Sequence, residues 1–148
     1  MKNLIFILTL SLAMGSITFA KDVISKDITV YFNPKCGCCH KWIKYLKENH
    51  YNVTEINKHN VAAEKKRLGV PEKLAACHTA VIDGYVVEGH ATHRDIKRLL
   101  LLRPDVTGIA IPGMPIGSPG MERGNTKEKY DVLTFDKKTG KTEVFVKH

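Results

Sequence analysis

Alternating apolar and polar residues divide the first half of the chain into short strands and helices. The segment Asp27–Phe32 alternates in this way, is rich in β-branched and aromatic residues, and predicts a strand. From Cys36 to about Asn49 the apolar residues fall mainly on one face and lysines on the other, which predicts a helix. Tyr51–Ile56 is expected to form a second strand. Val61–Leu68 is expected to form a short amphipathic helix, ended by the glycine and proline that follow it.

The next segment predicts a β-hairpin followed by a helix. A connector, Leu74–His78, leads into a strand at Thr79–Ile82, and the Asp-Gly pair after this strand is a strong hairpin signal. Tyr85–Val87 is expected to return as the partner strand. Thr92 is a candidate N-cap for a helix through Leu102, which stops before a proline.

The C-terminal part of the chain has a different character. Ile109–Gly124 is dense in glycine and proline and is expected to be a loop with little regular structure. Two alternating runs, Tyr130–Phe135 and Thr142–Val146, flank a polar turn and predict a terminal β-hairpin. The order of strands and helices, with a cysteine motif at the first strand–helix junction, is that of an α/β, thioredoxin-like protein. We therefore expect a mixed sheet with flanking helices, followed by the Gly/Pro loop and the C-terminal β-hairpin.

The first twenty residues predict export. A lysine precedes the apolar run Leu4–Leu12, and small residues then lead to Thr18 and Ala20, which is the layout of a secretory signal peptide. The alternative is a membrane anchor, but this apolar run is shorter than the roughly 20 residues that a span needs. No later stretch is apolar enough to cross a bilayer. We expect residues 1–20 to be a cleaved signal peptide and residues 21–148 to form a single domain.

The charge of the chain is basic but carries no signature of nucleic-acid binding. Lysine and arginine number 23 against 15 acidic residues, which gives a formal net charge of +8 at pH 7. The lysines are scattered, and no aromatic residues interleave with them as a stacking array, so a solvated surface is the preferred interpretation. The cysteines are then the remaining candidate for a cation site.

Four cysteines dominate the candidate chemistry. Three lie in the run Cys36-Gly37-Cys38-Cys39, and Cys77 follows much later. In an oxidising compartment four cysteines suggest two disulfides by default. A disulfide framework would spread its cysteines along the chain, whereas this chain concentrates them, which favours a metal site.

The cysteine run suits either redox chemistry or metal binding. Cys36 and Cys39 form a Cys-x-x-Cys pair at the N-terminus of the predicted helix, where backbone N–H groups and the helix dipole stabilise a thiolate. Beside a redox pair, the third thiol of Cys38 could form a wrong disulfide. At a metal site, Cys38 adds a ligand. The three sulfurs can meet only if Cys36 lies in the incoming loop. In a thioredoxin-like fold, Cys77 would then face them from the connector.

Clustered thiolates are ligands for soft metal ions. Sulfurs this close in sequence fit the bridging of several Cu(I) ions better than a single zinc tetrahedron, for which two separated cysteine pairs are usual. Zinc binding and a metal-free dithiol–disulfide role stay open as alternatives.

Histidines and methionines are secondary candidates. His78, Met114 and Met121 are candidate additional ligands, or groups that tune the site, because imidazole and thioether both bind copper. His90 and His93 flank the start of the predicted third helix and are expected to be surface or capping residues.

Several segments resemble those of a known family. They are Asn33-Pro-Lys-Cys-Gly-Cys-Cys-His, Gly69-Val-Pro, Cys77-His-Thr-Ala-Val-Ile-Asp-Gly-Tyr-Val-Val-Glu-Gly-His, and Ile111-Pro-Gly-Met-Pro-Ile-Gly-Ser-Pro-Gly-Met-Glu. In these segments the chain resembles the CopG-type periplasmic copper-resistance proteins. The resemblance implies a thioredoxin-like fold, a periplasmic location, a role in copper tolerance, and copper held by Cys36, Cys38, Cys39 and Cys77.

From the residues and the resemblance together, we expect a periplasmic protein that holds Cu(I) through four thiolates, with more than one ion bound. Its expected work is copper sequestration, transfer or interconversion of Cu(I) and Cu(II). The expected partners are copper ions and other periplasmic copper-handling proteins. The alternative is an enzyme, a thiol–disulfide oxidoreductase in which Cys36 attacks and Cys39 resolves.

Overall fold

The computed structural model describes residues 25–148, which contain seven strands, three α-helices and one 3-10 helix. In chain order these are β1 (Asp27–Phe32), α1 (Gly37–Glu48), β2 (Asn52–Asn57), α2 (Ala62–Leu68), η1 (Glu72–Leu74), β3 (Thr79–Ile82), β4 (Tyr85–Glu88), α3 (His93–Leu102), β5 (Gly108–Ala110), β6 (Asp131–Phe135) and β7 (Thr142–Lys147). The predicted signal peptide, residues 1–20, lies outside the described residues. Among those residues, none of the helices has the length and apolar character that a membrane span requires.

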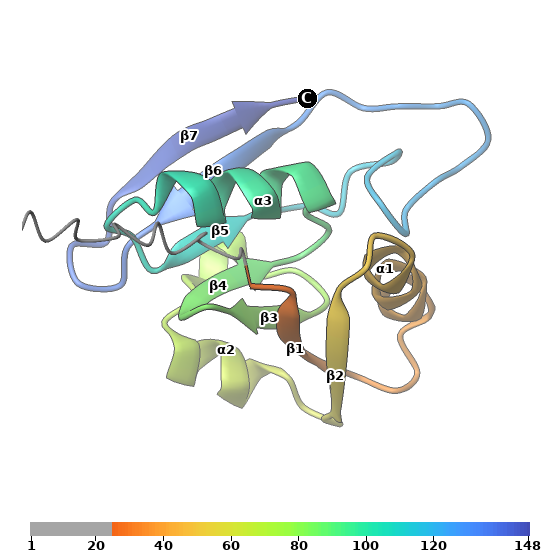
Figure 1. Cartoon of the computed structure of the whole chain (residues 1–148), viewed down its shortest axis with the longest axis horizontal. Helices are drawn as coiled ribbons and strands as arrows, with labels where there is room; N and C mark the ends of the chain where they lie inside the picture. The colour runs from red at the N-terminus through yellow and green to blue at the C-terminus, as the bar shows by residue number, and fades with distance from the viewer. Residues whose placement is uncertain (1–24) are drawn as a thin grey trace, which may run out of the picture.

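All seven strands belong to one mixed sheet with the order β2-β1-β3-β4-β5-β6-β7 (Figure 1). β1 pairs in parallel with β2, and β4 in parallel with β5, while the other neighbouring pairs are antiparallel. Helices α1 and α3 provide the crossovers that the two parallel pairs need. The turn between β3 and β4 has positive φ angles at Asp83 and Gly84, as a two-residue type I′ hairpin requires.

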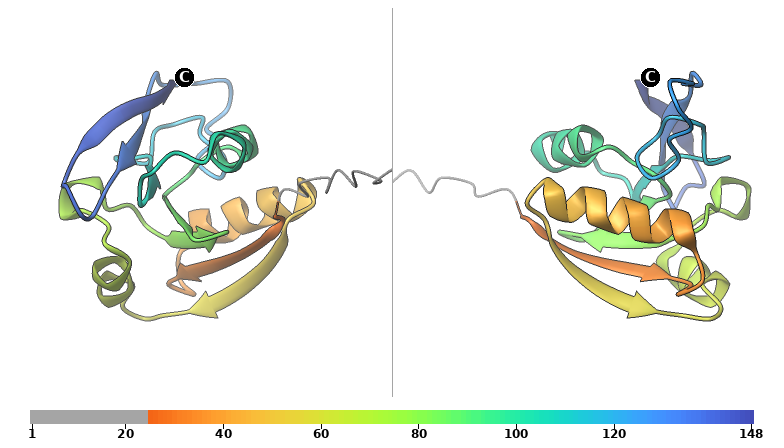
Figure 2. Two further views of the ribbon diagram at one scale, coloured as in Figure 1. Left: turned by 60° about the vertical axis from the view of Figure 1, so that its left-hand side comes forward. Right: turned by 90° about the vertical axis from the view of Figure 1, so that its right-hand side faces the viewer.

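Apolar side chains are buried on both faces of the sheet. On one face α1 and α3 lie over the strands (Figure 2), and Trp42 and Leu99 from these helices are fully buried in the larger core. On the other face a smaller cluster joins Leu74 of η1 to Val86 of β4. The adjacent Val87 belongs to the larger core, because successive strand residues point to opposite faces.

The predicted elements are confirmed within one or two residues, with one exception. Thr92 caps α3 as expected: its side chain accepts from Asp95 N at 3.1 Å, and the Asp95 carboxylate accepts from Thr92 N at 2.9 Å. The expectation of an irregular loop from Ile109 onward is wrong at its start, where β5 pairs with β4 and β6. This strand has only three residues and owes its formation to pairing on both sides, which no local sequence pattern reveals. The Gly/Pro loop beyond Ala110 and the terminal hairpin β6–β7 are confirmed.

Replacing Gly108 by alanine should destabilise the junction of β4 and β5. A Cβ atom at Gly108 would lie 1.9 Å from the Val86 carbonyl oxygen, so the two strands would have to move apart. We expect the free energy of unfolding, measured by urea denaturation, to fall by ~2–4 kcal/mol. Gly37→Ala is the matched control, because a Cβ atom there meets nothing within 4 Å. Equal stability of the two variants would contradict this close approach.

Candidate metal centre

The register of three strands brings the cysteine motif to two other segments at one end of the sheet. Tyr31, near the end of β1, pairs with Thr79, the first residue of β3. Thr79 also pairs with Glu88, the last residue of β4. The loop after β1, the connector before β3 and the turn after β4 therefore leave the sheet side by side. These segments and the first turn of α1 carry Cys36, Cys38, Cys39, Cys77, His78 and His90.

Cys36 lies immediately before α1 and caps it. Its backbone is extended, with φ −82° and ψ 98°, and its Sγ accepts a hydrogen bond from Cys39 N at 3.3 Å. Cys38 and Cys39 lie in the first turn of the helix. The condition that Cys36 lies in the incoming loop is therefore met, and this entry lets the three sulfurs approach one another.

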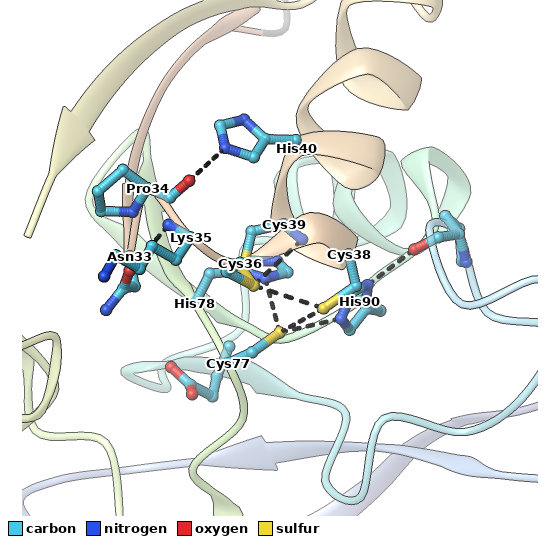
Figure 3. The surroundings of a disulfide bond; sticks show 12 residues. Asn33, Pro34, Lys35, Cys36, Cys38, Cys39, His40, Cys77, His78 and His90 are labelled. Carbon is cyan, nitrogen blue, oxygen red and sulfur yellow. Dashed lines mark hydrogen bonds between the residues drawn. A yellow bond between two sulfur atoms is a disulfide. The ribbon is translucent and has the colours of Figure 1, made fainter. Parts of the chain in front are cut away.

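The four sulfur atoms converge (Figure 3). Cys36 and Cys39 are joined in a disulfide, whereas Cys38 and Cys77 are free thiols. Cys38 Sγ lies 3.4 Å from Cys36 Sγ and 3.6 Å from Cys77 Sγ. All four sulfurs lie within 4.8 Å of one another. Once the disulfide is reduced, this four-cysteine cluster could bind a metal ion, because the thiolate is the ligand form of cysteine.

His90 belongs to the same cluster, so the expectation that it is a surface or capping residue is wrong. It is fully buried, and its Nε2 lies 3.0 Å from Cys77 Sγ. Its Nδ1 lies 2.8 Å from the Pro119 carbonyl oxygen, which can only accept, so Nδ1 carries the ring proton. Burial lowers the pKa of His90, which keeps the ring neutral. Nε2 therefore presents a lone pair to the sulfur.

His78 lies against Cys77 as its position next to that cysteine suggests, and it too is fully buried. Its ring contacts Trp42 and His90, with centroid distances of 4.3 and 4.7 Å, and its Nδ1 lies 3.2 Å from Cys77 Sγ. His78 Nε2 is a buried polar atom with no hydrogen-bond partner. Burial, and then the neighbouring His90 and Lys65, lower the pKa of His78 well below its usual value, so this ring is neutral as well.

Burial also controls the protonation state of the Cys77 thiol in the metal-free protein. Its removal from water, reinforced by the nearby Cys38, raises the pKa of the Cys77 thiol to about 12. Cys77 is therefore protonated at neutral pH. Its S–H can donate to His90 Nε2, and His78 Nδ1–H can donate to its sulfur, which assigns one proton to each contact.

A buried carboxylate holds the connector that carries Cys77. Glu88 is fully buried, and its Oε1 accepts from Ala76 N at 2.6 Å and from Lys65 Nζ at 2.5 Å. Its Oε2 accepts from Thr79 Oγ1 at 2.5 Å. Three donors compensate a charge that would otherwise be costly to bury. Sequence reasoning missed this residue, for which an acidic side chain at the end of an apolar strand is the only signal.

The Gly/Pro loop closes against the first turn of α1. Gly120 has φ +87°, and a Cβ atom there would lie 2.9 Å from Cys38 O and 3.0 Å from Trp42 N, so the contact requires glycine. Met114 and Met121 lie in this loop, the first 38% exposed and the second half-buried. Their contribution to metal binding stays a prediction.

Two other histidines make contacts of their own. His40 follows Cys39, but its Nε2–H donates to Pro34 O at 2.9 Å (Figure 3). Its ring packs edge-on against Phe32. His93 is the first residue of α3 and is half-buried, which agrees with its expected place at the start of that helix.

The raised pKa of Cys77 predicts slow alkylation in metal-free protein. In a Cys38→Ser variant with the disulfide intact, Cys77 is the remaining free thiol of the described chain. Because only the thiolate reacts, and because burial, the largest cause of the raised pKa, remains in this variant, the iodoacetamide rate should rise about tenfold per pH unit from pH 7 to 10 without levelling. Because this pKa is raised in the folded protein, the unfolded chain loses the Cys77 proton at a lower pH than the folded protein does. The free energy of unfolding should therefore decline above pH 9. A plateau near pH 9 in folded protein would contradict the effect of burial.

The chain is similar to one family model and to two solved structures. Residues 74–121 match a family described as a protein of unknown function, DUF411. No curated protein matches the chain. Two solved structures, "Copper resistance protein copG" Form 1 and Form 2, are both 43% identical to it, with TM-scores of 0.77 and 0.78. Each match covers 82% of this chain, and 96% and 97% of the respective structures. The chain therefore belongs to the CopG family of copper-resistance proteins.

Proposed function

We propose that this chain is a periplasmic copper-binding protein that holds more than one Cu(I) ion through the thiolates of Cys36, Cys38, Cys39 and Cys77. The observation that carries this proposal is the convergence of four sulfurs within 4.8 Å of one another. Thiolates are soft ligands that select Cu(I). The names of the two similar structures, copper resistance proteins, support copper as the ion.

Reduction prepares this site. A thiol reductant supplies two electrons and two protons to the Cys36–Cys39 disulfide and is itself oxidised to a disulfide. The chain then presents four thiols, and each thiol that binds Cu(I) releases its proton. Ligation removes the cost of ionising the buried Cys77, because the metal replaces the proton on its sulfur.

The proposal also includes a fold and a cellular location. Cys36 and Cys39 at the start of α1, which follows β1, and Cys77 in the connector before β3 support a thioredoxin-like fold for one domain, residues 21–148. Residues 1–20 have the composition of a signal peptide, which supports export to the periplasm. There the chain sequesters copper, transfers it to other periplasmic copper-handling proteins, or interconverts Cu(I) and Cu(II).

An anaerobic Cu(I) titration of the reduced protein against a competing chelator tests the proposal. We expect two or more copper ions per chain. Cys38→Ser and Cys77→Ser should each lower the stoichiometry or weaken binding by more than the 10–100-fold typical of losing an outer-shell partner. His40→Gln is the control, because its ring bonds Pro34 O and lies outside the sulfur cluster. Binding no tighter than that of thiol-blocked protein would refute the copper site.

The disulfide between Cys36 and Cys39 favours a second candidate, a thiol–disulfide oxidoreductase. In that role Cys36 attacks a substrate disulfide, and Cys39 then displaces the reduced substrate and re-forms the internal bond. Cys38 and Cys77 would be dispensable for this chemistry.

The Cys38→Ser variant separates the two candidates. If exchange needs only the pair Cys36 and Cys39, the rate at which the reduced variant reduces a glutathione mixed disulfide should stay within about twofold of the parent rate, while Cys39→Ser should stop turnover at the mixed disulfide. Loss of exchange in Cys38→Ser, with copper binding also lost, would favour the four-sulfur site over the dithiol enzyme.

A further inference from the structure

Formation of the Cys36–Cys39 disulfide removes two of the four sulfur donors but does not leave Cys77 without neighbouring ligands. Cys77 Sγ lies 3.2 Å from His78 Nδ1 and 3.0 Å from His90 Nε2. These three donor atoms form a second group within 4.8 Å of one another, which overlaps the four-sulfur group (Figure 3). Cys77 is the member that both groups share.

We propose that, while Cys36 and Cys39 are joined, Cys77, His78 and His90 form a mixed sulfur–nitrogen site for a borderline divalent cation of the class that includes Zn(II) and Cu(II). This deepens the proposed function and rests on it in one respect, since both sites bind metal at Cys77. Two imidazoles in place of two or three thiolates shift the preference from soft Cu(I) toward borderline ions.

The distances suit one ion. With metal–sulfur and metal–nitrogen bonds of about 2.3 and 2.0 Å, a tetrahedral ion holds sulfur and nitrogen about 3.5 Å apart. The two sulfur–nitrogen distances are slightly shorter than this, so the donors need to open by only a few tenths of an ångström. The fourth position is left for solvent or for Cys38, whose sulfur lies 3.6 Å from Cys77 Sγ.

His90 is already prepared as a ligand. Ligating histidines usually donate their other ring N–H to a carboxylate, a carbonyl or water, which fixes the tautomer. Pro119 O accepts from His90 Nδ1–H at 2.8 Å, so Nε2 faces Cys77 Sγ with its lone pair free. The neighbouring backbone is fixed as well, because Trp42 Nε1 donates to Ala91 O at 2.9 Å.

His78 presents its other ring nitrogen to the same sulfur. Its Nδ1 lies 3.2 Å from Cys77 Sγ, while its Nε2 is fully buried. A metal at Nδ1 requires the ring proton to move to Nε2. The Cys77 thiol proton leaves to solvent, so binding of one cation releases one proton in total.

A spectroscopic titration tests this site without copper redox chemistry. The protein is the Cys38→Ser variant with its disulfide intact, so that one free thiol remains in the described chain, and the probes are Co(II) and Zn(II). We expect one Co(II) per chain with a thiolate-to-cobalt charge-transfer band, and displacement of Co(II) by one equivalent of Zn(II). Adding His90→Gln should weaken binding at least about tenfold, whereas adding His40→Gln should leave it unchanged.

A second measurement needs no histidine variant and therefore does not depend on how such a variant folds. Long-range imidazole 1H–15N spectra, recorded with one equivalent of Zn(II), should shift His90 Nε2 and His78 Nδ1 to metal-bound values and leave His40 unchanged. Unshifted imidazoles, or binding that survives His90→Gln at full strength, would overturn the mixed site. The four-thiolate proposal would stand in that case, because its test uses Cu(I) and the reduced protein.

Discussion

Thr79 pairs with β1 through Tyr31 and with β4 through Glu88, and the positions of all the sulfur and imidazole donors depend on this register. It places the start of β3 between the end of β1 and the end of β4. A slip of one residue would turn alternate side chains to the other face of the sheet and separate the segments that meet there. The hydrophobic cores on the two faces, with Val86 on one and Val87 on the other, hold the strands in this alignment.

The metal-free site contains little net charge, although it is rich in polar atoms. The two buried imidazoles are neutral, Cys77 keeps its proton, and a disulfide joins Cys36 to Cys39. The fully buried carboxylate of Glu88 is balanced by Lys65. This arrangement avoids the large cost of isolated buried ions. Metal binding offsets part of the added charge, because thiol protons leave as the cation enters.

The sequence predicts the cysteine cluster better than it predicts the residues that surround the cluster. The spacing of Cys36, Cys38 and Cys39, with Cys77 in a connector, leads to an expectation of convergence if Cys36 lies in the loop before the helix and the fold is thioredoxin-like. His90 has no comparable signal, since its burial comes from a turn after β4 and a contact with Pro119 in a distant loop. Gly108 likewise looks like a loop residue until the two strands that flank it are in place. Local patterns record local geometry, and these features are made by long-range contacts.

The contact of Gly120 with the first turn of α1 has a consequence for the order in which the chain assembles its donors. Cys36 and Cys39 are only three residues apart and meet as soon as that turn forms. The segments carrying Cys77, His90 and Gly120 emerge later during synthesis, and closing the longer loops costs more chain entropy. In an oxidising compartment Cys36 and Cys39 can therefore pair before Cys77 reaches them, which keeps both sulfurs from cross-linking to Cys77 in the unfinished protein.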